Sequence, residues 1–404
     1  MTRRRACVLR MHEAQTRVNW GGRSTSLALA EILERHAGRT VVSTIGAPHI
    51  LGQLGDTDVR TDGHSVFEVV EELAVEIAAP RPATTKLAEV QAAISAADEL
   101  VVNGEGDFIL TERLTLVRTM AMMRAATLLG KPVYLVNSIL SYAPGRTDAD
   151  ALALDEVGRT LACCDAVVYR DPASLALHQE LYPDVSASWL PDALFAWSAH
   201  VQDTPAGRSG YTPETEGLPL PVHRLLADGR PYVVLSGTSR FGIDTEVLRE
   251  TIAALQERLA TAGVDVVFAG SDKPDRRLAD ALEGLHIHRV DPQIPLSAAT
   301  RLLWSASAMV SGRYHPSILA SLGGTPFLLM ESNSHKTRSL LDVVDNCWRR
   351  EEQPFFSGGV AQAADLADAV TEVRSHRGAR SVVRRSAVAN GVVVSEGIAA
   401  VLSG

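Results

Sequence analysis

Short runs of Val, Leu and Ile recur along the chain, and most are followed by a segment of helical length. In the first half the runs lie at 6–10, 40–45, 99–103, 132–137 and 165–170. Helical patterns lie between them at 24–37, 86–97, 111–129 and 148–162. The runs are almost continuously apolar rather than alternating, which is typical of parallel strands that are covered on both faces. This half therefore predicts a doubly wound α/β unit.

The same alternation restarts after a segment rich in Pro, Gly and Thr, residues 201–228. The second set of strand candidates lies at 232–237, 264–270, 286–290, 308–312 and 326–330. Helix candidates lie at 245–262, 274–284, 297–306, 315–322 and 336–344, and 361–402 also has a helical pattern. Two such units in tandem predict an α/β fold with two Rossmann-like domains that face a cleft, as in the GT-B arrangement.

Composition excludes several functions. The 404 residues carry 39 Lys and Arg against 48 Asp and Glu, a net charge of −9, and no long basic run, so a nucleic-acid groove is not expected. The four cysteines form no CxxC pair and no zinc spacing, and we interpret them as buried thiols in a reducing compartment. The N-terminal residues lack the apolar stretch of a secretory signal, and no run of 18 uncharged apolar residues occurs. We expect a cytoplasmic protein with no transmembrane segment.

Candidate site residues follow the predicted strands, because ligands of open α/β sheets bind beyond the carboxyl ends of the strands. In the first half these are Gly104, Glu105, Gly106, Asp107 and Arg170. In the second half they are Ser236, Gly237, Arg313, His315, Glu331 and Lys336. Neither GxGxxG nor GxxxxGK[ST] is present, which excludes the usual dinucleotide and P-loop sites. Small residues and a few charges at one edge of each sheet suit an anionic ligand.

Each candidate has a structural alternative. The Gly104–Gly106 turn could serve only to relieve backbone crowding, and Arg170 with Asp171 could be a pair that opens a helix. Arg313 lies between an apolar strand and an apolar helix, so it is expected to be buried and must have an anionic partner. That partner is either a carboxylate of the chain or a bound anion.

The order of these motifs resembles the polysaccharide pyruvyl transferase family over about residues 15 to 345. The family's Arg-x-His before an apolar helix, its Gly-x-Pro and its later Lys correspond to Arg313-Tyr314-His315, Gly324-Thr325-Pro326 and Lys336. Its glycine-rich turn, its Arg-Asp pair and its Asp before a Phe correspond to Gly104-Glu105-Gly106, Arg170-Asp171 and LPDALF, which contains Asp192 and Phe195. Two turns depart from the pattern. Asn19-Trp20-Gly21-Gly22 lacks the family's acid, and Gly-Glu-Gly-Asp replaces a triple glycine.

The resemblance implies transfer of pyruvate from phosphoenolpyruvate onto hydroxyls of a saccharide or glycoside, with formation of a ketal. It implies an N-terminal acceptor domain (1–205), a linker (206–228), a C-terminal donor domain (229–380) and a helix (381–404) that packs back on the domains. Arg313 and Arg170 would hold the donor's two anionic groups, His315 would donate a proton, and Lys336 would attract the leaving phosphate. Glu105 or Asp107 would take the acceptor's proton. Ser236, Gly237, Asn19 and Glu331 would complete the binding site.

The same reading predicts no cofactor and no metal, with phosphoenolpyruvate as donor substrate. The acceptor is either a small glycoside or a lipid-linked saccharide, and the latter would be met by peripheral contact at the membrane surface. The chain is compatible with a homo-oligomer. Two other functions fit the same fold: a GT-B glycosyltransferase that uses a nucleotide sugar, and a non-catalytic relative of the family.

Overall fold

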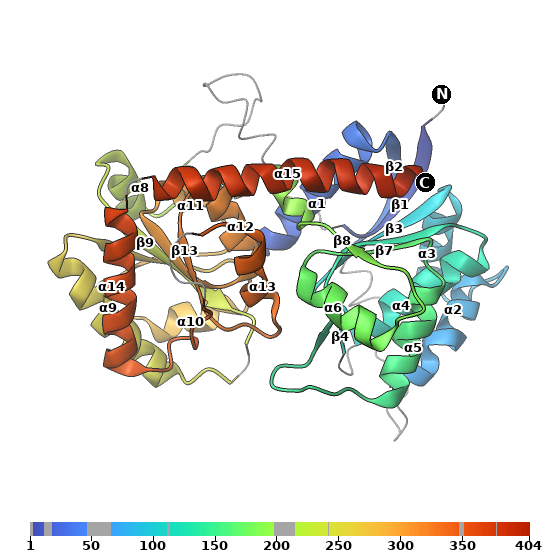
Figure 1. The fold of residues 1–404 in the computed structure, drawn as a ribbon, viewed down its shortest axis with the longest axis horizontal. Helices are drawn as coiled ribbons and strands as arrows, with labels where there is room; N and C mark the ends of the chain where they lie inside the picture. Colours follow the sequence, from blue (N-terminus) through green and yellow to red (C-terminus); the bar gives the residue numbers. More distant parts are fainter. Residues whose placement is uncertain are drawn as a thin grey trace. The chain divides into compact units, whose positions relative to one another are not determined.

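The computed structural model describes residues 3–11, 18–46, 66–110, 114–197, 215–240, 242–346, 351–376 and 378–404. The chain forms two compact units. Unit 1 comprises Met1–Glu13, Ser26–Ala193 and Val393–Gly404, and unit 2 comprises Ala14–Thr25 and Leu194–Val392. Each unit contains its own parallel sheet with helices packed on it (Figure 1).

Unit 1 is built on a six-stranded sheet with the order β2-β1-β3-β5-β7-β8, in which every pairing is parallel. The strands are β1 (Arg4–Met11), β2 (Arg39–Gly46), β3 (Glu99–Glu105), β5 (Val133–Ser138), β7 (Ala166–Tyr169) and β8 (Ser188–Trp189). The helices are α1 (Trp20–Glu31), which continues as a π-helical turn (Ile32–His36), α2 (Val70–Ala78), α3 (Thr85–Ser95), α4 (Leu114–Leu128), α5 (Ala151–Ala162) and α6 (Pro172–Leu181). A short ladder joins β4 (Ile109–Leu110) to β6 (Ser141–Tyr142). Strands β3 and β5 are buried along their whole length, as parallel strands covered on both faces should be.

Unit 2 contains a five-stranded parallel sheet with the order β11-β10-β9-β12-β13. Its strands are β9 (Tyr232–Thr238), β10 (Asp265–Ala269), β11 (His288–Val290), β12 (Ala308–Gly312) and β13 (Phe327–Leu329). Its helices are α8 (Leu220–Ala227), α9 (Thr245–Thr261), α10 (Asp275–Ala281), α11 (Leu296–Ser305), α12 (Tyr314–Leu322), α13 (Lys336–Val343) and α14 (Gly359–Ser375). Strand β9 lies at the centre, with β10 and β11 on one side and the later strands β12 and β13 on the other. The topological switch point therefore falls between β9 and β12.

The predicted fold class is confirmed, because both halves are Rossmann-like and each expected apolar run forms a strand. Some details differ from the expectation. The segment interpreted as a linker contains helix α8, while residues 206–214 lie outside the described residues. Helix α2 has no counterpart among the predicted helices. Residues 14–25 belong to unit 2 although they precede most of unit 1. That both sets of turns face one cleft stays a prediction.

The C-terminal pattern forms two helices, α14 and α15 (Ala379–Ser403), rather than one. Helix α14 packs against α9 of unit 2, and the two lie side by side in Figure 1. Helix α15 buries one stripe of residues, namely Ala379, Val383, Ala387, Val394, Ile398 and Leu402. In the part of the chain that the structure describes, α15 alone is long and apolar enough to cross a membrane, judged by length and composition only. Its buried stripe, with exposed residues between, is the pattern of a helix packed on a protein surface.

Candidate functional site

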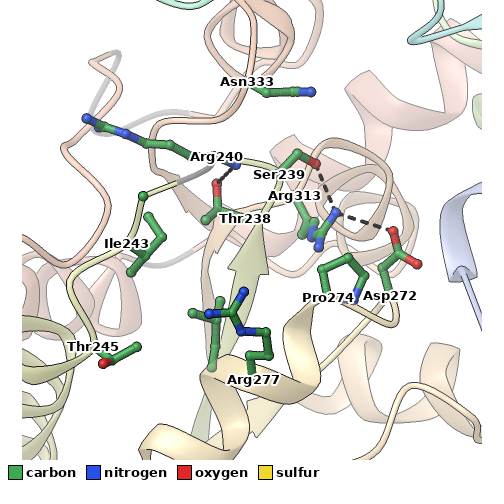
Figure 2. A pocket seen from close by; sticks show the side chains of 12 residues that line it. Thr238, Ser239, Arg240, Ile243, Thr245, Asp272, Pro274, Arg277, Arg313 and Asn333 are labelled. Atoms are coloured by element: carbon green, nitrogen blue, oxygen red, sulfur yellow. Dashed lines mark hydrogen bonds and ion pairs between the residues drawn. The ribbon is translucent and has the colours of Figure 1, made fainter. Parts of the chain in front are cut away.

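A pocket of about 350 Å³ opens in unit 2 at the carboxyl ends of the sheet strands. It lies at the switch point between β9 and β12, where ligands of open α/β sheets bind. Figure 2 shows its lining, which is Thr238, Ser239, Arg240, Gly242, Ile243, Thr245, Asp272, Pro274, Arg277, Leu278, Arg313 and Asn333. Three of these side chains are arginines, and Asp272 is the only acid among the lining residues that the structure describes. The local charge is therefore positive although the whole chain is acidic.

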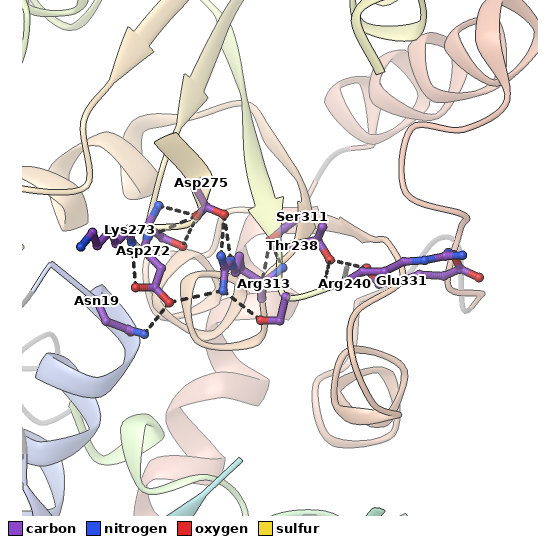
Figure 3. Close-up of polar contacts among 11 residues, drawn as sticks. Asn19, Thr238, Arg240, Asp272, Lys273, Asp275, Ser311, Arg313 and Glu331 are labelled. Atoms are coloured by element: carbon purple, nitrogen blue, oxygen red, sulfur yellow. Dashed lines mark hydrogen bonds and ion pairs between the residues drawn. The ribbon is translucent and has the colours of Figure 1, made fainter. Parts of the chain in front are cut away.

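Arg313 is held by the fold on both its backbone and its side chain. It follows β12 and is the N-cap of α12, and Ser311 and Ser317 both donate from Oγ to its carbonyl. Its Nε and Nη2 donate to Oδ1 of Asp275, at 3.2 and 2.5 Å. Its Nη1 donates to Oγ of Ser239 at 2.9 Å. One edge of the guanidinium is thus fixed to Asp275, while Nη1 contacts Ser239 and Asp272, two residues of the pocket lining (Figure 3).

Asp275 is fully buried at the start of α10, so it is the internal partner that the buried Arg313 required. Its second oxygen, Oδ2, accepts from the backbone N–H groups of Ser271 and Asp272. Gly237 makes room for this carboxylate, because a Cβ at Gly237 would lie only 1.9 Å from Oδ1 of Asp275. Gly237 was expected to contact the ligand, and in the structure it packs against Asp275 instead.

The start of α1 is attached to the same site. Asn19 caps this helix by accepting from the N–H of Gly22, and its Nδ2 donates to Oδ2 of Asp272 at 3.1 Å. Trp20 donates from Nε1 to the carbonyl of Pro292, and Arg23 donates to the carbonyl of Ile294. These bonds explain why residues 14–25 belong to unit 2.

His315 lies in the first turn of α12, two residues after Arg313. It is partly exposed and is not among the residues that line the pocket. A Cβ at Gly21 would lie 2.4 Å from Nδ1 of His315, so the imidazole packs directly on the backbone of α1. The Asn19–Gly22 turn and the Arg-x-His corner, far apart in sequence, therefore meet in unit 2.

The remaining candidates of unit 2 do not line the pocket themselves. Glu331 forms an ion pair with Arg240, and its carbonyl accepts from Oγ1 of Thr238. Lys336 donates from Nζ to Oδ1 of Asn333 at 2.6 Å. Ser236 is buried within β9. Of the residues predicted from the sequence, only Arg313 lines the described pocket directly, and Asn19, Glu331 and Lys336 each hold a lining residue.

Unit 1 contains a separate buried polar cluster at the ends of β3 and β5. Nδ2 of Asn137 donates to Oδ1 of Asn103, and Nδ2 of Asn103 donates to Oε1 of Glu105. Oδ1 of Asn137 accepts from the N–H of Ala193. Glu105 and Asn137 both have left-handed backbones, with φ of 41° and 56°. Such strain at non-glycine residues concentrates at functional sites. Among the other predicted residues of this turn, Asp107 is buried and accepts from Thr119, and Gly104 lies against Ser138, where a Cβ would be 2.4 Å away. Gly106 has open space around it.

Arg170 is 1% exposed and donates from Nη1 to Oδ2 of Asp192, which is fully buried. Asp171 accepts from the N–H of Ser174 and caps α6. Both residues therefore have the structural roles given as the alternative: Arg170 forms an internal ion pair and Asp171 caps a helix. The predicted contact of Arg170 with a ligand stays a prediction.

Sequence reasoning missed most of the pocket's charged residues, namely Arg240, Asp272 and Arg277, and it also missed Asp275, which anchors Arg313. The stretch Ser271-Asp272-Lys273-Pro274-Asp275 follows β10 directly, so its place after a strand was the available signal. The interpretation of the cysteines as buried thiols is confirmed only in part, because Cys7 is buried and Cys164 half-buried but Cys163 is exposed. No group of three or more potential metal ligands occurs within the described ranges.

Comparisons with known proteins agree with the fold and identify the family. No curated protein matches the sequence. Among solved structures, the chain is similar to a putative UDP-N-acetylglucosamine 2-epimerase from Listeria monocytogenes, with 13% identity, a TM-score of 0.58, and coverage of 100% of this chain and 96% of that one. It is also similar to Alr3699/HepE from Anabaena in complex with UDP and glucose, with 13% identity, a TM-score of 0.55 and 99% of each chain covered.

The UDP-GlcNAc 2-epimerase from Neisseria meningitidis, solved with UDP-GlcNAc, gives 11% identity and a TM-score of 0.55, with 98% of this chain and 99% of that chain covered. At such identities the likeness shows a shared GT-B-like fold and no more. The sequence itself matches a family model, polysaccharide pyruvyl transferase, over residues 23–334. That match covers most of the chain, and the protein belongs to the polysaccharide pyruvyl transferase family.

Proposed function

We propose that the protein transfers the pyruvyl group of phosphoenolpyruvate onto hydroxyls of a saccharide or glycoside, and that the donor binds in the arginine-lined pocket of unit 2. Family membership supports the reaction class. The observation that carries the choice of site is Arg313, whose one edge is fixed to Asp275 while Nη1 lies beside the pocket. A pre-positioned guanidinium binds anions with little loss of side-chain entropy.

The pocket matches the charge of the donor. Phosphoenolpyruvate carries a phosphate and a carboxylate, and the lining supplies Arg240, Arg277 and Arg313 together with the hydroxyls of Thr238 and Ser239. Each hydrogen bond to a charged group contributes about 1.5–3 kcal/mol. Lys336, which holds Asn333 of the lining, adds positive charge near the phosphate.

His315 is the proposed proton donor. Its proton passes to the methylene carbon of the donor, so C2 becomes electrophilic and the oxygen of one acceptor hydroxyl bonds to C2. A second hydroxyl oxygen then bonds to C2 and returns its proton to His315, the bond from C2 to the phosphate oxygen breaks, and phosphate leaves with the ketal formed. The place of His315 in the first turn of α12, two residues after Arg313, supports this role. Glu105, at the strained end of β3, is the proposed acceptor of the hydroxyl proton, with Asp107 as its alternative.

Replacement of His315 by Gln tests the proton donor. We expect donor affinity to stay within about threefold, while phosphate release from phosphoenolpyruvate with a panel of saccharide and glycoside acceptors falls about 10²-fold or more. His288→Gln is the matched control, because His288 lies on the edge strand β11 and does not line the pocket. Wild-type turnover by the His315 variant would assign the proton to another group.

A nucleotide-sugar transferase is the second candidate. Solved structures with this fold contain UDP or UDP-GlcNAc, and an arginine-lined pocket would also suit a diphosphate. A thermal-shift comparison of phosphoenolpyruvate with UDP separates the two candidates, because each predicts stabilisation by its own ligand.

A further inference from the structure

Asp272 lies beside Nη1 of Arg313 and lines the same pocket. Its Oδ2 lies 3.6 Å from Nη1 of Arg313 and accepts from Nδ2 of Asn19 at 3.1 Å, while its Oδ1 accepts from the backbone N–H of Lys273. Figures 2 and 3 show this carboxylate facing the guanidinium. The side chain is 26% exposed, so it is not locked in the interior.

The two carboxylates that face Arg313 differ in how firmly they are held. Asp275 is fully buried and makes two bonds to the guanidinium and further bonds to backbone N–H groups, so it cannot leave without loss of the local fold. Asp272 makes one longer ion pair to Nη1, and its other side-chain contacts come from the half-buried amide of Asn19 and one backbone N–H. Nη1 is therefore the part of Arg313 that an entering ligand can use, and Asp272 is the group with which the ligand must compete.

We propose that Asp272 is a specificity-determining residue that acts as an internal competitor for Arg313. Any anion that binds at Nη1 must replace or share this contact, so Asp272 weakens the binding of carboxylates and phosphates alike. A phosphate dianion beside Asp272 is also repelled about twice as strongly as a monoanionic carboxylate. Asp272 thereby lowers the affinity for phosphorylated anions more than the affinity for simple carboxylates. This inference rests on the proposed function only in that the arginine-lined pocket is the ligand site.

Asp272→Asn tests the proposal by removing the competing charge at almost constant size. Calorimetric titration with inorganic phosphate, phosphoenolpyruvate and acetate is the measurement. We expect the variant to bind phosphate and phosphoenolpyruvate about 3- to 10-fold more tightly, as a partly screened charge at this distance would give. Phosphate should gain more than acetate, so that the preference for phosphate over acetate rises, because the removed charge repels a dianion more strongly.

Asp280→Asn is the matched control. Asp280 lies on α10 and is exposed, it does not line the pocket, and its replacement changes the net charge by the same amount. Its phosphate affinity should stay within about twofold of the wild type. Asp272→Ala should move in the same direction as Asp272→Asn, which separates the loss of charge from any new contact of the amide.

The outcomes distinguish this inference from the proposed function. Unchanged phosphate and acetate affinities in both Asp272 variants, or an equal gain in Asp280→Asn, would overturn the competitor role alone. Tighter phosphate binding in a protein that does not bind phosphoenolpyruvate would support the competitor role and reject the proposed donor. Failure of the wild type and every variant to bind any of the three anions would overturn both.

Discussion

Arg313 and Arg170 are both buried arginines with a buried aspartate as partner, yet of the two only Arg313 lines the pocket of unit 2. The sequence could predict that a buried guanidinium needs an anion. It could not show whether the anion belongs to the chain, because Asp275 lies 38 positions and Asp192 lies 22 positions from its arginine. Pairs this far apart in the sequence are brought together by the tertiary fold and leave no local pattern.

Lysine replacements test the different roles of these arginines, since each keeps the charge that its buried aspartate requires. Arg313→Lys loses the contact of Nη1 beside the pocket, so phosphoenolpyruvate should bind about 10- to 100-fold more weakly, the equivalent of one hydrogen bond to a charged group. Arg170→Lys should leave the dissociation constant unchanged, because Arg170 is enclosed in unit 1. Calorimetry of both variants gives the answer. Equal weakening by both would return Arg170 to the ligand site.

Gly237 lies near a strand end, as the sequence predicted, but the sequence did not predict that it packs against Asp275. In Gly237→Ala the new methyl group would meet Oδ1 of Asp275, so the carboxylate that anchors Arg313 must shift. We expect a loss of about 1–3 kcal/mol in the free energy of unfolding, together with weaker anion binding. Gly106→Ala is the control, because nothing lies near the Cβ that it would introduce. Urea denaturation should separate the two variants, and equal stabilities would contradict the packing described for Asp275.

At the scale of elements, apolar runs predicted the strands of both sheets well, because parallel strands are buried on both faces and need no alternation. The assignment of the first turn of α1 to unit 2 was beyond such patterns. It depends on bonds from Trp20 and Arg23 to carbonyls 272 and 271 positions away. The strain at Glu105 was likewise invisible, because glutamate has no preference for a left-handed backbone. Asn137 gave only a weak signal, since asparagine is enriched in that region but occurs there in a minority of cases.

Helix α15 offers an element-scale test, because its apolar residues are divided between a buried stripe and an exposed face. Val383 is fully buried and Val392 is 47% exposed. Val383→Asp should therefore lower the free energy of unfolding by about 3 kcal/mol or more, whereas Val392→Asp should change it by about 0.5 kcal/mol or less. Guanidinium denaturation is the measurement. If Val392→Asp were the more damaging change, the face assigned to solvent would be the one that packs.

At the scale of the whole molecule, the fold does not decide the chemistry. A UDP-GlcNAc 2-epimerase, a putative one and a protein solved in complex with UDP and glucose share it at identities of 11–13%. The family match and the arginine-lined pocket carry the assignment, and the pocket arises within a chain of net charge −9. Global charge made a nucleic-acid groove unexpected, but it could not reveal a local cationic site, which depends on turns brought together by the sheet.

Titration of the wild-type protein with phosphoenolpyruvate, followed by competition with UDP, tests the central claim most directly. We predict saturable binding of phosphoenolpyruvate at one site per chain, with no displacement by UDP at equal concentration. Calorimetry provides both the affinity and the stoichiometry. Saturable binding of UDP in a protein that does not bind phosphoenolpyruvate would contradict the assignment and make the pocket a nucleotide-sugar site.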